Sequence, residues 1–171
     1  MRIVLVAKPG HENTGVGRYA CELSSALVAL GYDVTIIHPL IPFPAFLLEP
    51  LKNLLGWDLQ AFFHTYPLWA RYPQADLYHL TSQNLATLMH FHPPPGNTVV
   101  TVQDIIPWQV RENPELSVYN HKLAKFFDFL AMKGLHKVDG ILFISDFSRQ
   151  ALEKALDLPA KIKKTVLLGV N

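Results

Sequence analysis

The sequence has little cysteine and little charge. Cys21 is its only cysteine, so no disulfide can form within the chain. Charged residues make up 17% of the total and the formal net charge is +1, which excludes a generally basic nucleic-acid-binding surface. A lone cysteine is typical of a reducing compartment, so we expect a cytoplasmic protein.

Long apolar runs are missing as well. No stretch reaches the roughly 18 apolar residues that a membrane span needs. The apolar start, residues 2–7, is too short for a secretion signal and has no cleavage site after it. We therefore expect a soluble chain whose only membrane contact, if it makes one, is peripheral and at the inner face.

Several catalytic motifs do not occur in the sequence. There is no Gly-Lys-Ser/Thr, which excludes a P-loop nucleotidase. The eight histidines form no His-Glu-x-x-His motif and there is no Cys-x-x-Cys, so we expect no metal site. A Gly-x-Ser-x-Gly elbow is missing too, and no bound cofactor is expected.

What the sequence does contain is a regular alternation of short apolar runs and helical patterns. Six runs are predicted strands, at residues 2–7, 34–37, 77–80, 98–102, 140–144 and 165–168. Alternation of this kind predicts an α/β fold, a Rossmann-like doubly wound parallel sheet with helices on both faces. The length of 171 residues suits a single domain.

Two long helices have recognisable ends in the sequence. Asn13 or Thr14 can cap the first of them, and Gly31 is placed to end it. Asn113 as cap, with Pro114 as the first helical residue, predicts the start of the second.

Residues 41–72 form an insert that is longer than a usual connection and rich in aromatic residues. We predict short helices interrupted at Pro50 and a further helix capped by Asp58. One interpretation is a surface that meets a membrane or a lipid-linked acceptor. The other is a set of helices packed on the sheet or on another domain, which the insert's near-neutral charge favours.

Ligands of doubly wound sheets bind beyond the carboxyl ends of the strands, and this rule selects the candidate site residues. Thr81, Gln103 and Asp104 follow predicted strands directly. Asp104 can bind a sugar hydroxyl or cap a turn, and Trp108 can stack on a sugar or pack under a loop. Ser145 can line the same edge, although capping the next helix also explains it.

A glycine-rich turn opens the first long helix, and its residues are Gly15, Val16, Gly17 and Arg18. The pattern resembles a dinucleotide fingerprint, but a polar loop at residues 8–14 separates it from the strand. The second strand also ends in His38-Pro39, with no acid for a ribose, so NAD or FAD is not expected. Helix-terminal N–H groups and Arg18 still suit a phosphate. The alternative is a flexible helix-starting turn with Arg18 in solvent.

Five segments of the sequence, in this order, resemble the N-terminal domain of family 4 glycosyltransferases, which have the GT-B fold. They are GVGRYACELSSALVALGYDV at 15–34, ADLYHLTS at 75–82, VVTVQDIIPW at 99–108, VDGILFISDFSRQAL at 138–152 and KTVLLGVN at 164–171. The resemblance implies transfer of a sugar from a nucleotide-sugar to a glycan, lipid-linked or small-molecule acceptor. It also implies that the anomeric configuration is usually retained, without a required metal.

The resemblance implies roles for individual residues. Gly15, Gly17 and Arg18 correspond to the loop near the donor phosphates. Gln103 stands where the family usually has a histidine that faces the reaction centre, and a glutamine can hydrogen bond but cannot titrate.

Residues 168–171 resemble the linker to a C-terminal donor-binding domain, which this sequence does not contain. We therefore expect the acceptor-side half of an enzyme that pairs with a separate C-terminal domain. The alternative is a non-catalytic binding domain derived from such an enzyme. A nucleotide-sugar epimerase is disfavoured because there is no Tyr-x-x-x-Lys motif and no acid after the second strand.

Overall fold

The structure is a computed structural model. It describes residues 1–9, 14–41, 43, 44, 46, 48, 50, 52, 54, 58–119, 121–159 and 162–167. Its strands are β1 (Arg2–Val6), β2 (Asp33–Ile37), β3 (Leu77–Leu80), β4 (Thr98–Val102), β5 (Gly140–Phe143) and β6 (Ile162–Thr165). Its α-helices are α1 (Gly15–Ala29), α3 (Leu59–Thr65), α4 (Leu88–Phe91), α5 (Ile106–Gln109), α6 (Lys122–Gly134) and α7 (Asp146–Ala155). Two 3-10 helices are η1 (Gln83–Thr87) and η2 (Leu135–Lys137).

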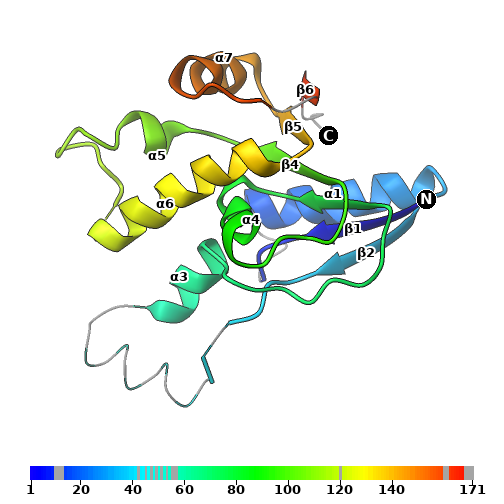
Figure 1. Cartoon of the computed structure of the whole chain (residues 1–171), viewed down its shortest axis with the longest axis horizontal. Helices are drawn as coiled ribbons and strands as arrows, with labels where there is room; N and C mark the ends of the chain where they lie inside the picture. The colour runs from blue at the N-terminus through cyan, green and yellow to red at the C-terminus, as the bar shows by residue number, and fades with distance from the viewer. Residues whose placement is uncertain are drawn as a thin grey trace.

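The described strands form one parallel sheet in the order β2-β1-β3-β4-β5-β6 (Figure 1). Strand β1 lies inside the sheet, with Val4 opposite Thr35 of β2 and Tyr78 of β3. Four of its five residues are buried, as expected for a continuous apolar run covered on both faces. The predicted Rossmann-like fold class is therefore confirmed.

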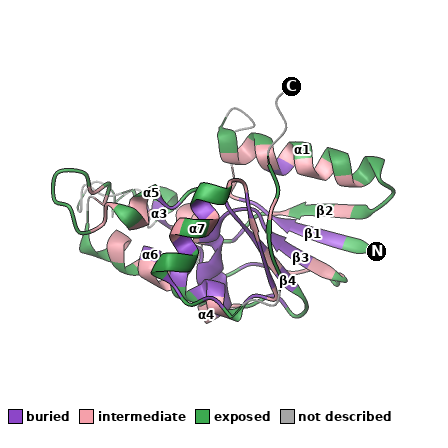
Figure 2. Cartoon of the chain, turned by 90° about the horizontal axis from the view of Figure 1, so that it is seen from above, coloured by how far each residue is buried: buried purple, intermediate pink, exposed green. Residues whose placement is uncertain are grey.

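Helices cover both faces of the sheet. Val4, Val6 and Val100 point into the main core, where Met132 of α6 and Leu152 of α7 also lie. Strand residues alternate between faces, so Ile3 and Leu5 point to the other side. Helix α1 covers that side, while α4, α6 and α7 lie on the opposite one (Figure 2).

The ends of α1 follow the prediction. The Thr14 side chain accepts a hydrogen bond from the backbone N–H of Gly17 at 3.2 Å, as a helix N-cap does. Gly31 follows the helix with φ of 85°, a backbone conformation that glycine adopts without strain. Of the two predicted caps, Asn13 lies outside the described residues.

The helix predicted to start at Asn113 begins later. The Asn113 side chain does accept hydrogen bonds from the N–H groups of Glu115 and Leu116, but the turn it closes is not continued. Helix α6 starts only at Lys122. Meanwhile the hydroxyl of Tyr119 donates to Asp128 on α6, which folds residues 113–119 back against the helix. Asn113 therefore caps a single turn, and the prediction that it caps the long helix was wrong, because His121 is the residue that precedes α6.

The last predicted strand, at 165–168, is also displaced. Strand β6 covers Ile162–Thr165, because Gly140 of β5 pairs with Ile162 and Phe143 with Thr165. An edge strand has only one neighbour and needs fewer apolar residues, so Lys163 and Lys164 belong to it although the apolar pattern starts later.

The insert at 41–72 is described in part. Asp58 caps α3 by accepting from the Ala61 N–H at 2.9 Å, as predicted. The predicted short helices interrupted at Pro50 rest partly on Leu47, Leu51 and Leu55, which lie outside the described residues. Among the described helices, none is both long and apolar enough to cross a membrane.

One glycine is required by close packing, which gives a test of the fold. A Cβ added at Gly134 in α6 would overlap the carbonyl oxygen of Ala86 in η1. We expect Gly134→Ala to lower the free energy of unfolding by about 1–3 kcal/mol, the usual cost of overpacking. Urea denaturation measures it. Gly15→Ala is the control, because nothing lies within 4 Å of its added Cβ; an equal loss in both variants would contradict the packing.

Candidate functional site

The carboxyl ends of β1, β3, β4 and β5 lie side by side in the sheet. Lys8 follows β1, Thr81 follows β3, Gln103 and Asp104 follow β4, and Ser145 follows β5. The structure thus brings four residues predicted from the sequence to one edge. Lys8 was not predicted, although a lysine two residues after the first buried strand was a usable signal.

A buried glutamine holds the backbone where β4 ends. The side chain of Gln83, which is buried, accepts from the N–H of Gln103 at 3.2 Å and donates to the carbonyl of Asp104 at 2.8 Å. The Gln103 side-chain amide in turn donates to the carbonyl of Thr81 at 3.0 Å. These three bonds join β3, η1 and β4 and determine how Gln103 and Asp104 are presented.

Asp104 is exposed and lies near a cation. Its Oδ1 accepts from the N–H of Ile106 at 3.3 Å, so its carboxylate also closes the turn into α5. Burial lowers the pKa of Lys8, and the charge of Asp104 opposes that shift. Lys8 is half-buried, and a half-buried cation beside an exposed carboxylate makes this corner suited to polar, hydroxyl-bearing ligands.

The hydroxyl groups of Thr81 and Ser145 already have partners. Thr81 is fully buried, and its hydroxyl donates to the carbonyl of Val6 at 3.0 Å. Ser145 caps α7 by accepting from the N–H of Ser148 at 3.1 Å. The first bond joins the end of β3 to β1 and the second caps α7, and the proposed contact of these side chains with a ligand stays a prediction.

The glycine turn forms the N-terminus of α1. The N–H of Gly17 is bonded to the Thr14 side chain and that of Arg18 to the Thr14 carbonyl. The N–H groups of Gly15 and Val16 have no partner of this kind among the described residues, and they begin a helix of 15 residues. Arg18 is exposed and its only described ion pair, to Glu22, is long at 3.8 Å. This geometry suits an anion, and donor binding here stays a prediction.

Trp108 packs against neighbours rather than standing free. Its ring is stacked on that of Phe129 with centroids 6.4 Å apart, and the guanidinium of Arg111 lies 4.0 Å from its centroid. Trp108 therefore connects α5 to α6. A role in lining a cleft for a sugar stays a prediction.

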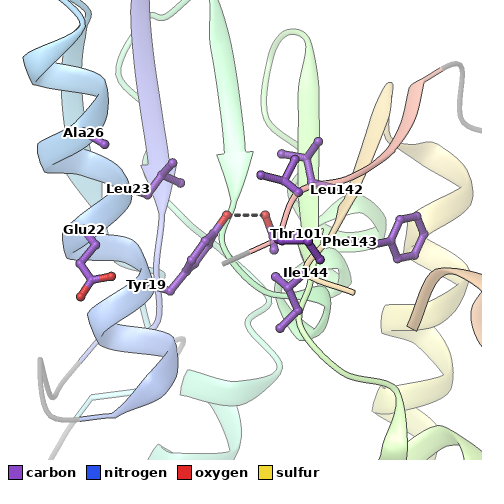
Figure 3. Close-up of a pocket in the computed structure, with 10 residues that line it drawn as sticks. Tyr19, Glu22, Leu23, Ala26, Thr101, Leu142, Phe143 and Ile144 are labelled. Atoms are coloured by element: carbon purple, nitrogen blue, oxygen red, sulfur yellow. Dashed lines mark hydrogen bonds between the residues drawn. The ribbon is translucent and has the colours of Figure 1, made fainter. Parts of the chain in front are cut away.

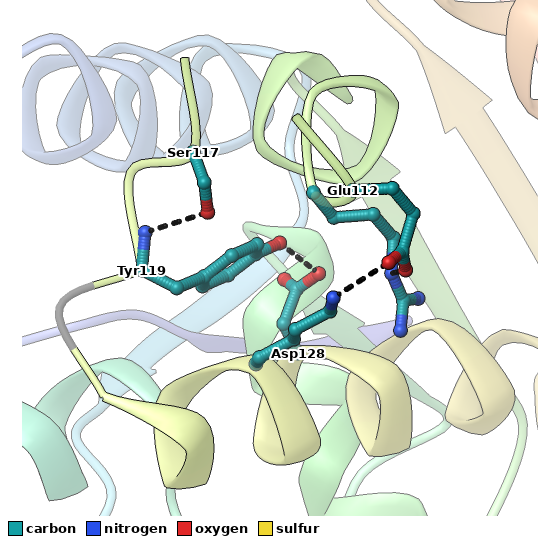
Figure 4. A network of polar contacts seen from close by, with 6 residues as sticks. Glu112, Ser117, Tyr119 and Asp128 are labelled. Atoms are coloured by element: carbon teal, nitrogen blue, oxygen red, sulfur yellow. Dashed lines mark hydrogen bonds and ion pairs between the residues drawn. The ribbon is translucent and has the colours of Figure 1, made fainter. Parts of the chain in front are cut away.

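A polar network beside Trp108 was not predicted at all. Asp128 on α6 is buried and accepts from the hydroxyl of Tyr119 at 2.6 Å, and Lys125 binds Glu112 at 2.9 Å (Figure 4). Burial raises the pKa of Asp128, while the charge of Arg111 lowers it. Only the three-dimensional fold brings these residues together, and they hold residues 111–119 against α6.

A cavity of about 340 Å³ lies between α1 and the ends of β4 and β5 (Figure 3). Its walls are mainly apolar, with Leu23 and Ala26 on one side and Leu142 and Ile144 on the other. The described residues that line it are Tyr19, Glu22, Leu23, Ala26, Thr101, Leu142, Phe143, Ile144, Val166 and Leu167.

Two hydroxyl groups that belong to residues lining this cavity connect it to a buried histidine. The hydroxyls of Tyr19 and Thr101 are hydrogen bonded at 2.8 Å, and Thr101 Oγ1 lies 2.8 Å from Nε2 of His79. Burial lowers the pKa of His79 to about 4, so the imidazole is neutral at physiological pH. Burial also raises the pKa of Tyr19, which keeps its proton. The network is neutral and suited to hydrogen bonding.

The described part of the chain offers no cluster of metal-binding side chains. No group of three or more His, Cys, Asp or Glu residues is placed there to hold a metal ion. The chemistry that the described edge offers includes hydrogen bonding from Gln103, the carboxylate of Asp104, and the cations Lys8 and Arg18.

The fold is a Rossmann-like domain that presents polar residues at the carboxyl ends of its strands, an architecture that each half of a GT-B enzyme has. A model of Glycosyltransferase Family 4 matches residues 13–170. The chain therefore belongs to glycosyltransferase family 4, and it corresponds to the N-terminal domain of such an enzyme.

Solved structures agree on the fold. The chain is similar to sucrose-phosphate synthase from Thermosynechococcus elongatus, with a TM-score of 0.59 and 15% identity over 99% of this chain. It spans about half, 48%, of that synthase. A second structure of the same synthase gives a TM-score of 0.53 and 14% identity, covering 100% of this chain and 91% of that one. No curated protein matches the chain.

The bonds made by Gln83 give the first test of this site. Gln83→Leu leaves the N–H of Gln103 and the carbonyl of Asp104 without their partner, so we expect a loss of about 1–3 kcal/mol in the free energy of unfolding. Urea denaturation measures the loss. Gln109→Leu is the matched control, because Gln109 is exposed, and it should change stability by less than about 0.5 kcal/mol. Equal stability of the two variants would contradict the role of Gln83.

His79 gives a second test, through pH. The pKa of His79 is about 4 in the folded protein and about 6.5 when the chain is unfolded, so the unfolded state binds the extra proton first. The free energy of unfolding should therefore fall as the pH drops from about 6.5 towards 4. Each unit of difference between the folded and unfolded pKa values of His79 contributes up to about 1.4 kcal/mol.

His79→Gln removes this titration. We expect the loss of stability between pH 7 and pH 5, measured by urea denaturation, to be smaller in the variant than in the unmodified chain. The comparison uses each protein's own value at pH 7 as reference, so that a constant cost of the substitution cancels. Equal losses in both proteins would show that His79 is not the titrating group.

Proposed function

We propose that the chain supplies the acceptor-side wall of a cleft in which a sugar passes from a nucleotide-sugar to a hydroxyl-bearing acceptor. The observation that carries the proposal is the corner at the end of β4. Gln83 holds its backbone by two hydrogen bonds, and the exposed carboxylate of Asp104 lies near the cation Lys8. Family membership supports sugar transfer as the reaction class. The corner provides polar groups at the carboxyl edge of the sheet, where ligands of such folds bind.

Asp104 and Gln103 have different proposed roles. The Asp104 carboxylate orients an acceptor hydroxyl or takes its proton, since it is exposed and carries a negative charge. Gln103 uses its N–H₂ group on the carbonyl of Thr81, so its side-chain oxygen is the atom that accepts from a sugar hydroxyl. Gln103 does not titrate, so proton transfer falls to Asp104 or to the substrates. Retention of configuration is the outcome that the family resemblance implies.

The donor diphosphate is proposed to meet the start of α1. The N–H groups of Gly15 and Val16 and the dipole of a 15-residue helix favour a phosphate there. Arg18 is exposed, and its long contact with Glu22 costs little to exchange for a phosphate. Cleft lining by Thr81, Trp108 and Ser145 is secondary, because their polar groups or rings already have partners.

This domain forms only one of the two walls of the proposed cleft. The chain spans 48% of the synthase it is similar to. Sugar transfer requires donor and acceptor to be held together with water excluded. We therefore propose that the nucleotide and most of its sugar are held by a C-terminal donor domain, either continuous with this chain or on a separate protein, and that the acceptor is a glycan, a lipid-linked molecule or a small molecule.

A second candidate function is binding without catalysis. It is favoured by two points: the family resemblance implies a titratable side chain where Gln103 stands, and the side-chain N–H₂ of Gln103 already donates to the carbonyl of Thr81. In that case the edge would retain a carbohydrate or a partner protein without turnover.

Release of nucleoside diphosphate from a panel of nucleotide-sugars tests the proposal. We expect no turnover by the 171-residue chain alone and turnover when a donor domain is supplied. In the complete system Asp104→Asn should lower kcat/KM about a hundredfold or more, the usual contribution of a positioned base. Glu115→Gln, which removes another exposed carboxylate, is the control and should have no effect.

The outcomes separate the candidates. Robust turnover by the chain alone would overturn the need for a donor domain. Turnover that is unchanged in Asp104→Asn would overturn the assignment of the site. Binding of a saccharide to the complete system with no turnover would instead support the non-catalytic function.

A further inference from the structure

Helix α6 is apolar on its outer side as well as its inner side. Its inner face is buried in the core through Ala131 and Met132. Yet Leu123 and Phe126 on the outer side are 40% and 52% exposed. On the neighbouring helix α4, Phe91 is 48% exposed. A helix with two apolar faces that is covered on only one of them presents a surface that water does not favour.

Ring contacts show that these exposed side chains belong to one surface. The ring of Phe127 lies 5.9 Å from that of Phe126, 6.1 Å from that of Phe91 and 5.1 Å from that of Phe62. Phe62 is buried and anchors the group to α3. We call Leu123, Phe126 and Phe91 the aromatic face. Packing of Phe127 against the buried Phe62 connects the aromatic face to the protein interior.

The charges that flank the aromatic face are positive. Lys122 and Lys133 are exposed and lie four residues before and seven residues after Phe126, on the same side of the helix. Lys133 Nζ lies 5.7 Å from the ring centroid of Phe129. The only acid of α6 is Asp128, which is buried and bonded to Tyr119. The exposed residues of α6 are therefore lysine and apolar side chains, and the exposed carboxylate of Glu112, which is not part of α6, is paired with Lys125 of the helix.

We propose that the aromatic face docks on an anionic lipid bilayer, with α6 lying in the plane of the surface. Helices that lie on membranes combine lysine flanks with exposed aromatic and leucine residues. The cores of protein–protein interfaces are instead depleted in lysine, which disfavours a protein partner. This docking goes beyond the proposed transfer reaction and does not depend on it.

Flotation of the full chain with lipid vesicles tests the docking. We expect binding to vesicles that contain about 30% phosphatidylglycerol and little binding to pure phosphatidylcholine. Binding to the anionic vesicles should weaken as salt is raised. Replacement of Lys122 and Lys133 by Gln should weaken it about fivefold for each lysine. The double variant Leu123→Ser, Phe126→Ser should weaken it tenfold or more, because the apolar anchor is lost.

A matched control removes two exposed apolar side chains elsewhere. Val28 and Leu30 at the end of α1 are 55% and 74% exposed, so Val28→Ser, Leu30→Ser should bind vesicles like the unmodified chain. Urea denaturation checks that all variants are folded.

Three outcomes would overturn the proposal. One is no binding to anionic vesicles, and another is binding that the change at Leu123 and Phe126 does not weaken. The third is self-association in size-exclusion chromatography that the same variant abolishes, since it would assign the aromatic face to a second copy of the chain. None of them bears on the transfer assay, which measures release of nucleoside diphosphate.

Discussion

Two hydrogen bonds from the side chain of Gln83 determine the path of the backbone as it leaves β4. They satisfy the N–H of Gln103 and the carbonyl of Asp104 away from water, where an unpaired polar group is costly. With the backbone held in this way, the Gln103 amide reaches the carbonyl of Thr81 and the Asp104 carboxylate faces solvent. The geometry of the candidate site therefore depends on the side-chain amide of Gln83, which is itself buried.

Most of the fold could be predicted because its signals are short in range. The run at β1, the Thr14 cap, the Gly31 helix end and the Asp58 cap each depend on residues within a few positions of one another. A parallel sheet then follows from the alternation of strands and helices. The sheet in turn places Thr81, Gln103, Asp104 and Ser145 at one edge, so this part of the site followed from topology alone.

The errors and omissions concern contacts between distant residues. Gln83 and Asp104 are 21 positions apart, and no local pattern connects them. The sequence predicts His79 only as part of a strand, and its hydrogen bond with Thr101 depends on the pairing of β3 with β4. At Asn113 the local cap signal was real, but the bond between Tyr119 and Asp128 holds the following residues in another conformation. In α6 the spacing of apolar residues predicts a helix. It does not show which apolar face is buried in the core and which is exposed.

The two hydrogen bonds that connect His79, Thr101 and Tyr19 must donate in the same direction. The Thr101 hydroxyl carries one proton and can donate it to one neighbour only. If Nε2 of His79 is unprotonated, Thr101 donates a hydrogen bond to it and accepts one from the hydroxyl of Tyr19, so the phenol offers only lone pairs to the cavity. If Nε2 carries the proton, the order reverses and the phenol hydrogen is free to point outward. The tautomer of one buried imidazole thus selects whether this cavity prefers a guest with a donor or a guest with an acceptor, without any change of net charge.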